Sequence, residues 1–247
     1  MNARQLAILA AVVFAIASPI LQAVGNIGLS ASEFARSGDQ TLRAAGYAFS
    51  IWSLIYAGLV AFAIYQALPR QRDDALLKIV AGPAFVAIAG TGLWIWASAF
   101  DARWASVGII VVSTGSLTLG LLRAARTAPR PDLKARVFAW WPLSLLAGWL
   151  TIASAINILT VMTAEGLLND MPRAAAFAGV VAVLVVALSV LRTPRLSVHA
   201  IPIAWGLVAV WVAENGSKSD VAALALASAV LVAGYAAWQS RPIAARR

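Results

Sequence analysis

The sequence predicts an all-α integral membrane protein, a helical bundle of about eight transmembrane helices. Of the 247 residues, 62% are hydrophobic and only 12% are charged, whereas soluble domains usually carry about 25% charged residues. Long apolar runs recur along the chain, and a helix crosses the hydrocarbon core in roughly 20 residues. There is too little polar surface to face water on all sides, so most of the chain is expected to face lipid.

Eight apolar windows are expected to cross the membrane. In chain order they are 5–24, 46–67, 76–99, 104–123, 136–160, 174–191, 199–213 and 220–239. The first follows Arg4 as a signal peptide would, but it is long enough to span and is expected to be retained. The seventh is the weakest because it is short and contains Pro202. Without it there would be seven spans, and the C-terminus would change sides.

The charges favour eight spans with both termini in the cytoplasm. This arrangement puts 14 of the 19 basic residues inside and 5 outside, while 7 of the 10 acidic residues lie outside. Such a basic bias is what the positive-inside rule requires. Seven spans would move Arg241, Arg246 and Arg247 outside and weaken it. We expect a bacterial inner membrane protein, and we assign the net charge of +9 to topology rather than to nucleic acid, which is not an expected partner.

The connecting segments are short except for one. The outer loop 25–45 has small, polar and charged residues, and it is long enough to fold over the outer mouth of the bundle. The inner loop 124–135 is basic, contains two prolines, and is expected to be an exposed connector. The helices show no convincing internal repeat, which disfavours an inverted-repeat transporter.

Several kinds of chemistry are disfavoured. Charged residues lie at or near the predicted span ends, so there is no proton relay and no lysine for a retinal Schiff base. The chain has no cysteine. Its single histidine, His199, could be an axial ligand for a haem or chlorophyll, but we favour a side chain that caps or solvates a helix start. We therefore expect no catalytic residues, no metal site and no enzyme.

Aromatic residues are concentrated where the second window begins. Phe49, Trp52 and Tyr56 fall on one helix face, which indicates either packing against another helix or the wall of a ligand pocket. The membrane interface suits five of the ten tryptophans: Trp104, Trp140, Trp141, Trp211 and Trp238. Trp149 and Trp205 lie well inside their spans, where a buried indole N–H without a partner costs on the order of 2–7 kcal/mol.

The fifth window combines small residues with an indole and an amide. Trp149 and Asn157 are two turns apart, near one helix face, with small residues such as Gly148 and Ala153 beside them. This pattern is consistent with a tight helix crossing, in which Asn157 bonds to a neighbour. It is equally consistent with a slot, in which Asn157 orients a ligand.

At these residues the chain resembles the TspO/MBR family, the tryptophan-rich sensory proteins related to the mitochondrial translocator protein. The family's second helix carries an aromatic opening followed by Trp and, four residues later, Tyr. Trp52 and Tyr56 in "YAFSIWSLIY" match this spacing. Its fifth helix carries Trp, then Ala four and Asn eight residues later, matched by Trp149, Ala153 and Asn157 in "WLTIASAIN".

The resemblance covers residues 1–163, with departures. The family's third helix has Asn three residues before Trp, where "TGLW" has Thr91 before Trp94. The double proline before the second-helix motif is missing, and the interval from Pro142 to Trp149 is longer than usual. The chain therefore resembles the family as a longer, divergent relative, with a TspO/MBR-like five-helix bundle at 1–163 and three additional transmembrane helices at 164–247.

The resemblance implies a pocket for porphyrins, haem-like tetrapyrroles or sterol-like lipids, covered by the outer loop. A tetrapyrrole would be a ligand, and no cofactor is assigned with certainty. Family members often dimerise. The ligand-binding residues implied by the resemblance and by the aromatic pattern are Tyr47, Phe49, Trp52, Tyr56, Thr91, Trp94, Trp149, Ala153 and Asn157.

We therefore expect a non-enzymatic membrane protein that binds a hydrophobic or aromatic small molecule for sensing or transport. The alternative is a structural or accessory subunit of a larger membrane complex, which would dock through the extra helices and the basic inner surface. The expected partners are membrane lipid, a small hydrophobic ligand, and either a second copy or a membrane-complex protein.

Overall fold

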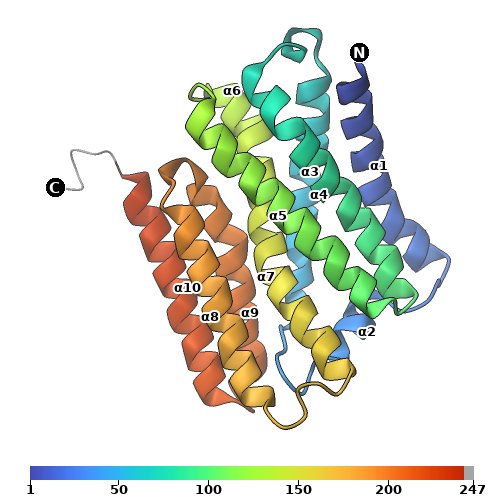
Figure 1. Ribbon diagram of the computed structural model, residues 1–247, viewed down its shortest axis with the longest axis vertical. Helices are drawn as coiled ribbons and strands as arrows, with labels where there is room; N and C mark the ends of the chain where they lie inside the picture. The colour runs from blue at the N-terminus through green and yellow to red at the C-terminus, as the bar shows by residue number, and fades with distance from the viewer. Residues whose placement is uncertain (242–247) are drawn as a thin grey trace. The chain divides into compact units, whose positions relative to one another are not determined.

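The structure, a computed structural model, describes residues 1–241 (Figure 1). Within these residues the chain forms helices and no strand. The long helices are α1 Ala3–Val24, α3 Ile51–Ala67, α4 Ala75–Ala99, α5 Arg103–Thr127, α7 Trp141–Ala164, α8 Pro172–Leu191, α9 Ala200–Glu214 and α10 Ser219–Ser240. The short ones are α2 Ala31–Arg36, η1 Gly46–Ser50, η2 Pro69–Gln71, α6 Leu133–Ala135, η3 Arg136–Trp140 and η4 Pro194–His199.

The predicted all-α membrane bundle is confirmed. Eight helical segments of the described chain are long and apolar enough to cross a membrane, and each overlaps one predicted window. The weak seventh window lengthens to Pro194–Glu214 because η4 leads directly into α9. Pro202 falls in the first turn of α9, where a helix tolerates a residue that lacks an N–H donor.

The chain forms two compact units. Unit 1 comprises Met1–Phe34 and Ile51–Ala147, and unit 2 comprises Ala35–Ser50 and Gly148–Arg247, of which residues 242–247 lie outside the described part. The boundaries therefore fall inside α2 and inside α7, so α7 contributes to both units. The predicted division at residue 163 is a different partition of the chain and stays a prediction.

In unit 1, α4 packs against both α1 and α5. Glycines bring these helices close together. A Cβ atom added at Gly90 of α4 would collide with the Ser113 hydroxyl of α5, and one added at Gly120 of α5 would collide with the Pro83 ring of α4. Close backbone approach over small residues is the usual way in which helices associate in lipid, because lipid tails are as apolar as the side chains.

Polar side chains cross-link α1 to its neighbours. The amide of Gln5 donates to the carbonyl of Gln66 (2.8 Å), and the amide of Gln66 donates back to the carbonyl of Gln5 (3.1 Å). Both side chains are almost fully buried. On the same helix, the Ser18 hydroxyl accepts a hydrogen bond from the Trp96 indole N–H at 3.1 Å. Each of these bonds satisfies a polar group that would otherwise be buried without a partner.

A π-helical turn, η3, precedes α7. Pro142 has no N–H to donate to the carbonyl four residues earlier, and the turn before it widens so that the Trp141 N–H bonds to the Arg136 carbonyl. The Pro142 ring lies against α3, where a Cβ atom added at Gly58 would come within 3.2 Å of it. The Arg136 guanidinium sits 5.5 Å from the centre of the Trp141 ring.

In unit 2, α10 packs against α8 and α9, and the second half of α7 joins them. Glycines again mark the closest approaches. A Cβ atom at Gly148 of α7 would collide with the His199 carbonyl and would lie 2.7 Å from Cγ of Pro202. A Cβ atom at Gly179 of α8 would lie 2.6 Å from the Leu159 side chain. Gly148, one of the small residues identified in the fifth window, therefore makes a tight helix crossing.

We expect Gly148→Ala to destabilise the protein, because the added methyl group meets a backbone carbonyl that cannot rotate away. Overpacking of this kind costs typically about 1–3 kcal/mol. The matched control is Gly234→Ala in α10, where an added Cβ atom meets nothing within 4 Å. Thermal unfolding in detergent should show a lower midpoint for Gly148→Ala and an unchanged or higher midpoint for Gly234→Ala. Equal midpoints for both variants would contradict this account of the crossing.

Candidate functional site

The predicted ligand-binding residues are distributed over both compact units. Trp52, Tyr56, Thr91 and Trp94 belong to unit 1. The unit 2 residues are Tyr47, Phe49, Trp149, Ala153 and Asn157. The residues of each group contact neighbours within their own unit. A ligand pocket shared by both groups stays a prediction.

In unit 1, the motif of the second span forms a pair of stacked rings. The centres of the Trp52 and Tyr56 rings are 5.1 Å apart and their planes are 26° from parallel. The pair follows from the i, i+4 spacing, which places both side chains on one face of α3. Both rings are half-buried, so part of their aromatic surface stays accessible.

The third-span residues are held by neighbours in unit 1. The Trp94 ring meets the ring of Phe34 edge to face, with centres 6.1 Å apart. Phe34 is the only buried residue of α2, and it comes from the outer loop. The Thr91 hydroxyl donates to the carbonyl of Ile88 at 2.7 Å and is buried. Its hydrogen therefore already has an acceptor within α4.

In unit 2, Trp205 contacts Tyr47 and Ala48, at the start of the second-span motif. Its ring packs edge to face on Tyr47, with centres 5.1 Å apart, and its indole N–H donates to the Ala48 carbonyl at 3.1 Å. The predicted ligand residues included neither Trp205 nor Phe34. The position of Trp205 inside its span was the available signal, because an indole N–H there needs an acceptor.

The fifth-span motif lies on the most buried helix. In the span that contains α7, 72% of the most apolar window is buried, against 50% or less in the other seven. Trp149 and Asn157 are 6% and 4% exposed, and Ala153 is half-buried. The Trp149 indole is therefore enclosed by protein and does not point into lipid.

The interpretation of His199 as a capping or solvated side chain is wrong. The residue does occupy the start of α9, but its side chain makes no capping hydrogen bond and is completely buried. Its Nε2 atom lies 3.5 Å from the Thr151 hydroxyl of α7. The close crossing at Gly148 brings α7 against the backbone of His199, and the sequence gives no signal of that packing. Among residues 1–241, no group of three or more His, Cys, Asp or Glu side chains could hold a metal ion.

Within unit 2, a buried carboxylate holds the second half of the outer loop against the end of α9. Glu214, at the end of α9, is fully buried. It accepts hydrogen bonds from the Arg43 backbone N–H (2.7 Å), the Ser217 hydroxyl (2.9 Å) and the Lys218 ammonium (3.1 Å). The Arg43 guanidinium in turn donates to the Ala213 carbonyl at 2.8 Å. A buried charge of this kind is tolerated because it is both paired and hydrogen-bonded.

Two further bonds hold the same loop. The Ala45 N–H donates to the Ala209 carbonyl at 3.0 Å, and the Thr163 hydroxyl bonds the buried Thr41 hydroxyl at 2.6 Å. Gly38 lies against Thr160 so closely that a Cβ atom would collide with it. Loop residues 35–45 are therefore ordered on α7 and α9. Their predicted role as a cover over a ligand stays a prediction.

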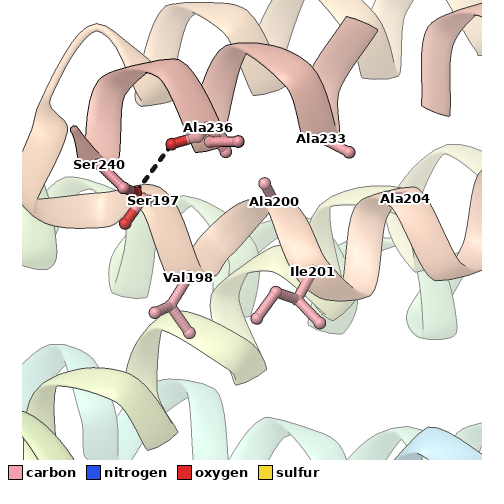
Figure 2. A pocket seen from close by; sticks show the side chains of 9 residues that line it. Ser197, Val198, Ala200, Ile201, Ala204, Ala233, Ala236 and Ser240 are labelled. Carbon is pink, nitrogen blue, oxygen red and sulfur yellow. Dashed lines mark hydrogen bonds between the residues drawn. The ribbon is translucent and has the colours of Figure 1, made fainter. Parts of the chain in front are cut away.

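A separate groove lies elsewhere in unit 2. It is lined by Ser197, Val198, Ala200, Ile201, Ala204, Ala233, Ala236, Ala237 and Ser240, and its volume is about 300 Å³ (Figure 2). None of the predicted ligand-binding residues lines it.

We expect Glu214→Ala to loosen the outer loop. The substitution leaves the Arg43 backbone N–H without its acceptor, a loss of about 1–3 kcal/mol. Hydrogen–deuterium exchange should show faster exchange of amides 35–50, and Glu214→Gln should restore part of the protection because it keeps an acceptor oxygen. The matched control is Asp220→Ala, which breaks an exposed ion pair with Arg173 and should leave the loop protected. Unchanged loop exchange in Glu214→Ala would refute the fastening.

The chain matches the model of a known protein family. The family model described as TSPO-like protein matches residues 5–238. No curated protein and no solved structure matches the chain. The matched range runs through all eight spans, including the last three helices, which the resemblance to five-helix members left without a counterpart. Taken with the eight-span bundle, this match over nearly the whole chain shows that the protein belongs to the TSPO-like family.

Proposed function

We propose that the protein binds a hydrophobic, aromatic small molecule, a tetrapyrrole or a sterol-like lipid, for sensing or transport and without catalysing a reaction. The observation that carries the proposal is the pair of stacked, half-buried rings of Trp52 and Tyr56 in a member of this family. A flat ligand gains from aromatic faces, because offset-stacked and edge-to-face arrangements add about 0.5–1.5 kcal/mol beyond the area that they bury.

The other predicted residues support the same class of ligand. Trp94 and Trp149 have indole rings, and Asn157 has a buried amide on α7. Pockets of this type are mostly apolar, with a few polar groups that fix the orientation of the ligand. The acidic and basic residues of the described spans are distant in the sequence from these residues. This separation favours binding of an uncharged or weakly polar ligand and disfavours ion-coupled transport.

We expect Trp52→Leu and Trp149→Leu each to weaken binding of protoporphyrin IX by about 3- to 10-fold, because each removes one aromatic surface. The affinity should be measured from the shift in porphyrin absorbance, since the substitutions themselves change tryptophan fluorescence. Trp104→Leu and Trp238→Leu are the controls, because these rings are exposed.

Normal affinity in both test variants would refute the assignment of the pocket. Recovery of chemically altered porphyrin would instead refute the non-enzymatic proposal. Co-purification with other membrane proteins at fixed stoichiometry, with no porphyrin binding, would favour the accessory-subunit alternative.

The proposed membrane is the bacterial inner membrane, with both termini in the cytoplasm, and the charge bias supports this orientation. Because the chain has no cysteine, single-cysteine variants report topology without background labelling. A membrane-impermeant maleimide applied to spheroplasts should label Gln40→Cys in the outer loop and leave Thr127→Cys unlabelled until the cells are lysed. Both native side chains are exposed. The reverse labelling pattern would invert the proposed orientation.

A further inference from the structure

The groove in unit 2 lies between the start of α9 and the end of α10. Its walls are apolar except for Ser197 and Ser240. In Figure 2 the Ala200 side chain points toward α10, and the hydrogen bond from the Ser240 hydroxyl to the Ala236 carbonyl (2.8 Å) closes the last turn of that helix. Its volume of about 300 Å³ is at the lower limit for ligand pockets. Five of the nine lining residues are alanines, whose small side chains leave the space between the two helices unfilled.

The groove lies near the end of unit 2 at which all the described charged residues are basic. Arg192 follows α8, Arg195 lies in η4 two residues before Ser197, and Arg241 directly follows Ser240. The acidic residues described for this unit lie in the outer loop or near the opposite ends of the helices: Asp39, Glu165, Asp170, Glu214 and Asp220. An apolar groove thus adjoins a cationic rim, a combination that matches an amphiphile with an anionic head.

We propose that this groove is a binding site for an anionic phospholipid. One acyl chain lies along the alanines of α9 and α10, and the phosphate lies at the rim formed by Arg195 and Arg241. Basic pockets between transmembrane helices on the cytoplasmic side are known to suit anionic headgroups. The site is separate from the residues proposed to bind the aromatic ligand, and the inference does not depend on that function.

A second copy of the chain is the rival occupant, since Ala200 and Ala204, like Ala233 and Ala237, have the spacing that helix pairs use in lipid. The charges argue against it. Two copies in one membrane share the same orientation, so a symmetric contact through this face would bring two sets of Arg192, Arg195 and Arg241 together. Like charges brought together in this way repel each other, whereas a lipid phosphate carries the opposite charge.

The test uses the full-length protein, delipidated in detergent and titrated with short-chain phosphatidylglycerol or phosphatidylcholine, with bound lipid counted by native mass spectrometry. The wild-type protein should retain phosphatidylglycerol in preference to phosphatidylcholine. Ala237→Leu fills the groove from an exposed position and should abolish the retention. The double variant Arg195→Gln with Arg241→Gln should keep the groove but weaken phosphatidylglycerol binding by about 30-fold, at the usual contribution of one basic residue each.

The controls are Ala227→Leu, at an exposed position of α10 outside the groove, and Arg173→Gln, which removes a cation at the opposite helix ends. Both should bind like the wild type. Equal retention of the two lipids would overturn the proposal, as would normal phosphatidylglycerol retention in Ala237→Leu. A lipid-free dimer that Ala237→Leu dissociates would overturn it in favour of the second copy.

Discussion

The structure depends on one constraint: a polar group removed from water must find its partner inside the protein. The backbone meets it by forming helices throughout the spans. Side chains meet it in pairs, as where Gln5 and Gln66 exchange amide bonds between α1 and α3. The same need ties the Trp205 indole to the Ala48 carbonyl and surrounds the Glu214 carboxylate with three donors. Polar bonds therefore decide which segments meet, although apolar residues dominate the composition.

Small residues decide how closely those segments meet. Gly148 brings α7 onto the backbone of His199, and Gly90 and Gly120 bring α4 onto α5. Lipid offers little hydrophobic drive for helix association, so van der Waals contact over glycine and alanine replaces it. In unit 2, the small side chains of alanines on α9 and α10 line the groove. Small residues thus make close helix crossings, through glycine, and line the groove, through alanine.

The two proposed sites differ in the physics of recognition. The aromatic residues of α3, α4 and α7 suit a flat, weakly polar ligand, because they offer ring faces and one buried amide. The groove between α9 and α10 offers no ring, and its selectivity would come from the arginines at its rim. A porphyrin and an anionic phospholipid would therefore respond to different substitutions.

The sequence by itself determined the class of the protein, its eight spans and its family, because hydropathy over about 20 residues and the spacing of Trp52 to Tyr56 are local properties. It also marked Trp205 as an indole in need of an acceptor. Only the tertiary structure decided that Ala48 is that acceptor, that residues 35–50 pack with the C-terminal helices, and that His199 is buried. These outcomes depend on contacts between residues more than 100 positions apart or on close crossings such as that at Gly148, and no local pattern encodes which distant segment will supply the partner.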